Sequence, residues 1–197
     1  MNKFFLSLIL VASSFIRVNA QDYVLFYLQP NGAFLNQNGE TYTVVEYDGK
    51  SALELYNMVK NNVMSLYNDP KSVMSENEPE MISIHGFHDK IWYRAIYYGG
   101  NYKLTFRFKD GKIRVDSPSV DRELVRTSEF TRFDMKLPTS LYFSECAKKC
   151  CNSDSSKNQK RKKKVEDVVN LPINYLLGKL SNTDNNQNET DETDDDW

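Results

Sequence analysis

The sequence is poor in the residues and patterns on which most catalytic and metal sites depend. It has two histidines and three cysteines in 197 residues, and it has no GxSxG, HExxH, P-loop or dinucleotide-binding fingerprint. His85 and His88 stand three apart in a β-rich stretch, which directs them to opposite faces of a strand and disfavours a shared metal ion. We therefore expect no enzyme activity, no catalytic residue, no metal and no cofactor.

The chain also has no apolar run long enough to cross a membrane. Its N-terminal run, 4–16, has 13 residues, whereas a transmembrane helix needs about 18 or more. Lys3 precedes the run, and the small residues Val18 and Ala20 follow it, which is the order found in a secretory signal peptide. We expect cleavage between Ala20 and Gln21, export to the periplasm or the extracellular space, and no transmembrane segment in the mature chain.

A large net charge is absent as well, but the value of −2 averages two strongly biased segments. Residues 157–164, KNQKRKKK, carry six positive charges, and residues 182–197 carry seven negative charges and no positive one. Such blocks are typical of solvated segments. The sequence predicts a signal peptide (1–20), a folded domain (21–138), a Cys-containing and basic linker (139–164), an amphipathic helix packing on the sheet (165–181) and a disordered acidic tail (182–197).

The folded region alternates between β-rich stretches and one clear helix. A capping box, Ser51 to Glu54, begins a helix that is expected to end near Tyr67. The predicted strands are 41–47, 81–87, 91–98, 101–109 and 112–120, with turns at Gly99-Gly100 and Asp110-Gly111. A later helix is predicted over 171–180, started or kinked by Pro172. This order predicts an α+β fold: a strand, a helix, a four-strand antiparallel meander and a last helix, with the helices on one face of the sheet.

Three stretches in this region resemble a known family: VVEYDGKSALELYNMV, MISIHGF and LTFRFKDGKIRVDSPSV. The family is an exported Bacteroidetes-type domain of unknown function with a fold like that of the TATA-binding protein. The resemblance covers about residues 41–120 and, in outline, the later helix. It implies one curved antiparallel sheet covered on one face by helices. It implies no established activity, so it supplies no catalytic residues, and the segment from about 122 to 160 departs from it.

The stretch KLTFRFKDGKIRVD carries the main candidate site. With a two-residue Asp110-Gly111 loop, Lys109 lies opposite Lys112, Phe108 opposite Ile113, Arg107 opposite Arg114 and Thr105 opposite Asp116. Like charges placed directly opposite each other destabilise a sheet. Two readings follow: the charges splay into solvent, or Arg107, Lys109, Lys112 and Arg114 form a face that binds an anion. Nucleic acid is not expected, because the chain is predicted to be exported and this face has no row of stacking aromatics.

The remaining charged and cysteine-containing segments leave alternatives open. The basic run is either a solvated linker or a segment that binds anionic lipid or lipopolysaccharide through its positive charges. The acidic tail is either a solvating appendage or an internal cover for a basic surface. Cys146 can form a disulfide with Cys150 or Cys151 only if the segment is not a regular helix, and the remaining thiol would then be available for an intermolecular bridge. The spacing CxxxCC does not match a zinc site.

The sequence as a whole favours an exported, non-enzymatic binding or interaction module of the bacterial cell envelope. Its partner would be an anionic polymer or lipid held on the open sheet face, or an unknown envelope protein. The alternative function is a structural accessory subunit that docks on another envelope protein.

Overall fold

The computed structural model describes residues 23–93, 96–127 and 138–180. Its strands are β1 (Tyr27–Leu28), β2 (Phe34–Leu35), β3 (Tyr42–Glu46), β4 (Met74–Asn77), β5 (Met81–Tyr93), β6 (Tyr97–Lys109), β7 (Lys112–Val120), β8 (Glu123–Arg126) and β9 (Ser140–Tyr142). Its helices are α2 (Ala52–Leu66), α3 (Pro70–Val73), α4 (Phe143–Cys151) and α5 (Ser156–Leu176). The predicted signal peptide, its cleavage position at Ala20 and Gln21, and the acidic tail lie outside the described residues.

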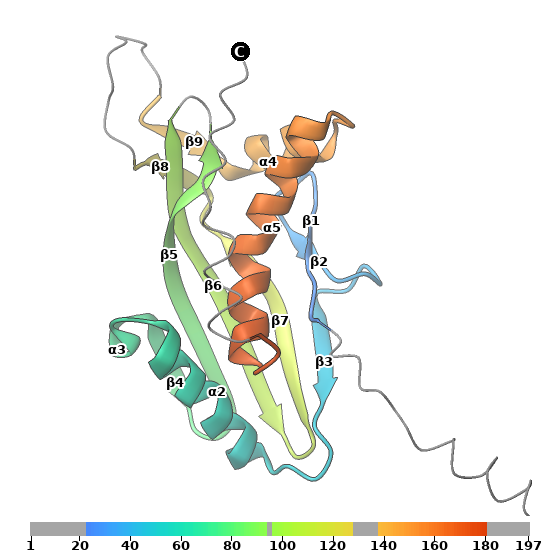
Figure 1. The fold of residues 1–197 in the computed structure, drawn as a ribbon, viewed down its shortest axis with the longest axis vertical. Helices are drawn as coiled ribbons and strands as arrows, with labels where there is room; N and C mark the ends of the chain where they lie inside the picture. The colour runs from blue at the N-terminus through green and yellow to red at the C-terminus, as the bar shows by residue number, and fades with distance from the viewer. Residues whose placement is uncertain (1–22, 94–95, 128–137, 181–197) are drawn as a thin grey trace, which may run out of the picture.

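Most of the strands form one curved antiparallel sheet in the order β3-β7-β6-β5-β4, to which β8 and β9 add beside β6. Strands β1 and β2 make a separate small hairpin. Helices α2 and α5 both lie across the same face of the sheet, and the opposite face is left open (Figure 1). The predicted α+β class, the curved antiparallel sheet and the helical layer on one face are confirmed. No helix in the described ranges is both long and apolar enough to span a membrane.

The β6–β7 hairpin has the predicted register. Lys109 pairs with Lys112, Phe108 with Ile113, Arg107 with Arg114 and Thr105 with Asp116. Gly111 has a φ of 75°, the left-handed conformation that a two-residue hairpin turn requires and that glycine adopts without strain. Five apolar side chains of the two strands are at most 5% exposed and form the centre of the core: Leu104, Phe106, Phe108, Ile113 and Val115.

Helix α2 begins at the predicted capping box. The Ser51 hydroxyl accepts from the Glu54 N–H, and the Glu54 carboxylate accepts from the Ser51 N–H at 2.8 Å. The helix buries Leu55, Tyr56, Val59 and Val63 against the sheet, where the Tyr56 ring meets the edge of Phe108 at 5.7 Å between centroids.

The strand boundaries predicted around residues 91–100 were wrong. Residues 91–98 do not form a strand of their own, because 91–93 end β5 and 97–98 begin β6, and Gly99-Gly100 lies inside β6 rather than in a turn. A Cβ at Gly99 would lie 2.5 Å from the His88 carbonyl oxygen, and one at Gly100 would lie 2.9 Å from the Leu124 side chain. The glycines therefore serve the close approach of neighbouring strands. The meander still has four strands, but they are β4, β5, β6 and β7, so that β4 takes the place of the separate strand predicted over 91–98.

The segment 139–164 is not a linker in the structure but contains β9, α4 and the first turns of α5. Ser155 caps α5 by accepting from the Asn158 N–H at 3.3 Å, and the Arg161 guanidinium lies over the Trp92 ring at 5.5 Å. One side of the basic run thus packs on the rest of the fold through Arg161. The run therefore forms the first part of α5, whose later residues are buried. Pro172 lies inside α5 instead of near its start, so the predicted span 171–180 is also corrected.

Polar side chains on α5 hold the N-terminal segment along the helix. Asn174 accepts from the Val24 N–H and donates to the Val24 carbonyl, both at 2.8 Å, and Asn170 does the same for Phe26 at 2.9 Å. Glu166 accepts from the Leu28 N–H at 2.8 Å. Four helical residues rise about 6 Å, close to the roughly 6.6 Å that two strand residues span. The four-residue spacing on α5 therefore matches the two-residue spacing of the bonded positions along the N-terminal segment. We call Glu166, Asn170 and Asn174 the α5 ladder.

Candidate functional site

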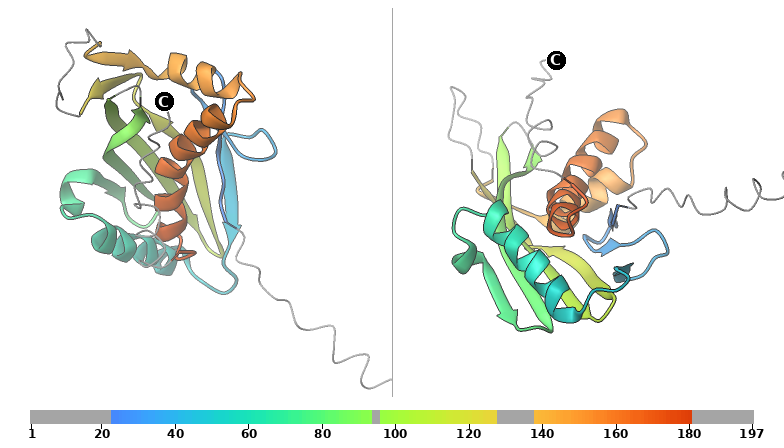
Figure 2. Two further views of the ribbon diagram at one scale, coloured as in Figure 1. Left: turned by 45° about the horizontal axis from the view of Figure 1, so that its top comes forward. Right: turned by 60° about the horizontal axis from the view of Figure 1, so that its bottom comes forward.

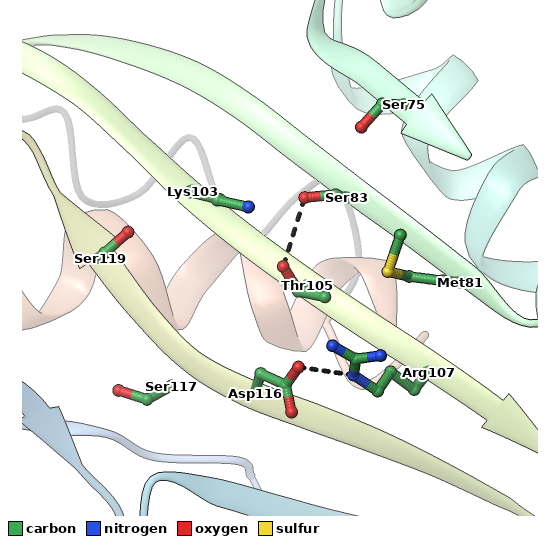
Figure 3. Close-up of a pocket in the computed structure, with 9 residues that line it drawn as sticks. All are labelled: Ser75, Met81, Ser83, Lys103, Thr105, Arg107, Asp116, Ser117 and Ser119. Carbon is green, nitrogen blue, oxygen red and sulfur yellow. Dashed lines mark hydrogen bonds and ion pairs between the residues drawn. The ribbon is translucent and has the colours of Figure 1, made fainter. Parts of the chain in front are cut away.

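The open face of the sheet has a pocket of about 340 Å³, at the lower end of the size range of small-ligand sites (Figure 3). We call it the open-face pocket. It is lined by Ser75, Met81, Ser83, Lys103, Thr105, Arg107, Asp116, Ser117 and Ser119.

Strand pairing places the centre of this pocket on one row that crosses four strands. Ser75 of β4 lies opposite Ser83 of β5, Ser83 lies opposite Thr105 of β6, and Thr105 lies opposite Asp116 of β7. Paired residues project to the same face of a sheet. The Ser83 and Thr105 hydroxyl oxygens are 3.3 Å apart. The row therefore presents three hydroxyl groups and one carboxylate side by side.

Asp116 resolves the conflict between the opposed arginines. Its two carboxylate oxygens accept one bond each, from Arg107 Nε at 2.8 Å and from Arg114 Nε at 2.7 Å. The arginine side chains are about half exposed, whereas Asp116 is 21% exposed. One carboxylate between two guanidinium groups offsets the repulsion that the register would otherwise impose. It also fixes the direction of Arg107, whose terminal nitrogens point toward Thr105 (Figure 3).

A bulge in β7 adds two further serines. Pairing changes between Lys103–Ser119 and Thr105–Asp116, so Ser117 and Pro118 together oppose the single residue between Lys103 and Thr105. A bulge redirects side chains and increases local twist. Ser117 donates its hydroxyl to the Phe34 carbonyl, which ties the β1–β2 hairpin to the rim of the pocket.

Of the four predicted site residues, which lie in two adjacent pairs on the hairpin, only Arg107 lines the open-face pocket. Arg107 lines the open-face pocket, whereas Arg114 is held by Asp116 and lies over the Tyr42 ring at 4.3 Å. Lys109 and Lys112 face each other beside the turn and are not among the residues that line the pocket. Lys103 enters the site on the same strand as Arg107, four residues earlier.

The prediction missed the hydroxyl groups and Asp116 as members of the site. Thr105 and Asp116 were already in the predicted register, so their shared face was available from the alternation of the hairpin. The place of Ser75 and Ser83 in the pocket could not be predicted in this way, because it depends on the pairing of β4, β5 and β6.

The three cysteines lie on or at the end of a regular helix, α4, so the condition for the proposed bridge between Cys146 and Cys151 is not met, and none of the three forms a disulfide. Burial raises the pKa of the Cys150 thiol to about 12. Cys151 donates to the Leu28 carbonyl at 3.3 Å, beside the α5 ladder. A thiol with a raised pKa is a poor nucleophile, which is consistent with a packing role.

The chemistry that the open-face pocket offers is recognition of a polar anion. Lys103 and Arg107 supply positive charge at its two ends, and the serine and threonine hydroxyls between them both donate and accept. Within the described residues, no group of three His, Cys, Asp or Glu side chains is arranged to hold a metal ion.

Comparison with known protein families and with characterised proteins finds no match. Among solved structures, the chain is similar to a TBP-like protein from Parabacteroides distasonis, with 12% sequence identity and a TM-score of 0.45. The similarity covers 68% of this chain and 90% of that protein. At this level the likeness does not place the chain in that protein's family, and the fold is established by the strand order and helix positions of the chain itself.

Proposed function

We propose that this protein is an exported, non-enzymatic binding module of the bacterial cell envelope that holds an anionic ligand in the open-face pocket. The observation that carries the proposal is the Arg107–Asp116 pair, because a carboxylate that occupies only Nε leaves the terminal nitrogens of Arg107 directed into the pocket. Guanidinium nitrogens in this arrangement suit a carboxylate or phosphate group. The N-terminal segment of the sequence supports export to the periplasm or extracellular space.

The other lining residues support binding rather than catalysis. The nine residues that line the pocket include no histidine and no cysteine, and the single carboxylate, Asp116, is already engaged by two arginines. A general base needs a free carboxylate or imidazole within reach of the proton that it removes. The hydroxyls of Ser75 and Thr105 instead offer bonds to the uncharged parts of a ligand, while the buried Ser83 hydroxyl donates to the Leu104 carbonyl beneath them.

Retention on an immobilised anionic polysaccharide, polygalacturonate, tests the proposal. We expect the Lys103→Gln/Arg107→Gln variant to elute at much lower salt than the wild type, with affinity reduced on the order of tenfold or more for the loss of two charge-assisted contacts. The matched control, Lys109→Gln/Lys112→Gln, removes the same charge from the same hairpin outside the pocket. Equal loss in both variants would show that retention follows overall charge, and the proposal would then be wrong.

The second candidate function is that of a structural accessory subunit that docks on another envelope protein. One observation favours it: Tyr23, Leu25 and Tyr27 alternate along the N-terminal segment and are 53, 44 and 37% exposed. Such a row suits protein contact more than solvent. The retention experiment separates the two functions, because a docking subunit would keep its retention when Lys103 and Arg107 are substituted.

A further inference from the structure

The first turns of α5 present a row of lysines to solvent. Lys157, Lys160, Lys163 and Lys164 are all exposed, and they share one face of the helix because Lys160 lies three residues from Lys157 and from Lys163 and four from Lys164. Lys163 forms an ion pair with Asp167 at 2.6 Å. Lys157, Lys160 and Lys164 form no ion pair with any described residue. On α4, the neighbouring helix, Lys148 and Lys149 are also exposed.

This placement of charge opposes helix formation. The N-terminal end of a helix carries a partial positive charge, so acidic side chains stabilise its first turn and lysines destabilise it. The first turn of α5 has no acidic residue. The Ser155 cap and the Lys163–Asp167 ion pair offset part of this cost, but the other three lysines of the row have no ion-pair partner among the described residues. A local rule that is only partly compensated is expected at functional sites more often than elsewhere. The row therefore calls for an external anion rather than for a role in folding.

Exposed aromatic side chains lie at the same end of the molecule. The end of β5, strands β8 and β9, helix α4 and the first turns of α5 gather there (Figures 1 and 2). Trp92, near the end of β5, packs under Arg161 of α5, so Tyr93 projects to the other side of the strand end. Tyr93 is 48% exposed, and its ring lies 5.0 Å from that of Tyr97. Tyr142, directly before α4, is 53% exposed. Tyrosine is suited to the boundary between water and a bilayer, because its ring is apolar and its hydroxyl is polar.

We propose that this end of the molecule is a docking surface for a bilayer that carries anionic phospholipids. We call it the basic end, and it comprises Lys148, Lys149, Lys157, Lys160 and Lys164 together with Tyr93 and Tyr142. The lysines supply long-range attraction to the headgroups, and the tyrosines supply contact at the interface. Lysine is a compact point charge, which suits a field of mobile headgroups better than one oriented ligand. This surface is separate from the open-face pocket, and the proposal does not depend on the proposed function.

Co-sedimentation of the full mature chain with vesicles tests the proposal. We expect binding at low salt to vesicles that contain phosphatidylglycerol, and little binding to vesicles of phosphatidylcholine alone. The Lys157→Gln/Lys160→Gln/Lys164→Gln variant should lose on the order of a hundredfold in its partition coefficient, from the usual contribution of each basic residue near an anionic surface. The matched control, Lys50→Gln/Lys109→Gln/Lys112→Gln, removes the same charge at the opposite end of β6. Lys109 and Lys112 flank the β6–β7 turn, and Lys50 precedes α2 beside it, where its carbonyl accepts from the Gly111 N–H at 2.7 Å. Equal loss in the two triple variants would overturn the proposal.

Two further measurements make the result specific. Substituting Tyr93→Ser and Tyr142→Ser should weaken vesicle binding at high salt, where the lysine contribution is screened. The Lys103→Gln/Arg107→Gln variant should bind vesicles as the wild type does, so failure of the open-face pocket and failure of the basic end are distinguishable. The opposing outcome is a protein that binds dextran sulfate in solution and yet fails to sediment with phosphatidylglycerol vesicles. That result would show that the surface binds polyanions and not a bilayer, and it would reject the proposal.

Discussion

The two faces of the sheet hold polar side chains in opposite states. On the helix-covered face, Asn170 and Asn174 are 7 and 2% exposed, and each makes at least two hydrogen bonds within the protein. On the open face, the side chain of Arg107 is about half exposed, and its terminal nitrogens are directed into the pocket. Polar groups on the covered face are therefore committed to the fold, whereas those on the open face retain bonding capacity for a ligand.

This difference separates stability from recognition. Removing a buried hydrogen-bonding group leaves its partners without water, so the cost appears in the free energy of unfolding. Removing an exposed cation costs little stability, because its contacts are screened and solvated. Substitutions on the covered face should thus change unfolding, and substitutions in the open-face pocket should change binding.

The largest expected effect comes from breaking the α5 ladder. Asn174→Ala removes the acceptor for the Val24 N–H and the donor to the carbonyls of Val24 and Asn170. The buried backbone groups of Val24 would lose their partners, so we expect the free energy of unfolding to fall by about 3 kcal/mol. Urea unfolding followed by circular dichroism measures the loss, and hydrogen exchange at the Val24 amide reports local release of the N-terminal segment.

A matched substitution provides the control. Asn61→Ala makes the same change on an exposed face of α2, where alanine is the better helix former, and it should change the unfolding free energy by less than about 0.5 kcal/mol. If the two variants had similar stability, the α5 ladder would contribute no more than a surface contact, and the contrast between the two faces would fail.

An intermediate effect is expected at Asp116, the one carboxylate that lines the open-face pocket. Asp116→Asn keeps the shape of the side chain but removes the charge that separates Arg107 from Arg114. We expect a loss of about 1 kcal/mol in the free energy of unfolding, as appropriate for two partly exposed ion pairs and a newly opposed like-charge pair. The loss should shrink at high salt, because screening weakens both terms.

The double variant Asp116→Asn/Arg114→Gln tests the cause of that loss. Removing one of the opposed arginines should recover part of the stability, since only Arg107 then remains without a partner. A double variant less stable than the single variant would mean that Arg114 stabilises the sheet in another way, for example through its position over the Tyr42 ring.

The features that the sequence predicted well depend on residues close together in the chain. Two of them, the Asp110-Gly111 turn and the capping box at Ser51, are each specified within four residues, and both were confirmed. The hairpin register followed from the turn and predicted that Arg107 would face Arg114. The consequence for the site was missed, because neutralisation depends on Asp116 lying close enough to bridge both guanidinium groups.

The features that were wrong or missing depend on contacts between distant residues. Gly99-Gly100 is typical of a turn, but its role depends on the close approach of His88 and Leu124. The basic run 157–164 is typical of a solvated linker, but Arg161 packs on Trp92 and the helix continues into the buried half of α5. The hydroxyl row of the pocket comes from strands β4 to β7, and alternation within one strand does not reveal which strands are neighbours.

The smallest expected effect comes from Glu166, the one charged member of the α5 ladder. Burial raises the pKa of its carboxyl group, against the opposing effects of the Leu28 N–H and of Lys162 at 3.7 Å. A carboxyl group whose pKa is higher in the folded state stabilises the fold when protonated, and this contribution is lost as pH rises through the folded pKa. The ionised form is therefore the less favourable one in the folded protein.

Glu166→Gln keeps an oxygen for the Leu28 N–H and removes the buried charge. We expect the variant to be slightly more stable than the wild type at neutral pH, by less than the effect at Asp116. The advantage should disappear on acidification, once Glu166 of the wild type is protonated, and the low-pH comparison is thus the internal control. Urea unfolding of both proteins across this pH range measures the difference. A variant that is less stable at neutral pH would show that the ion pair with Lys162 outweighs burial, and that a charge on the covered face can contribute to the fold as the two asparagines do.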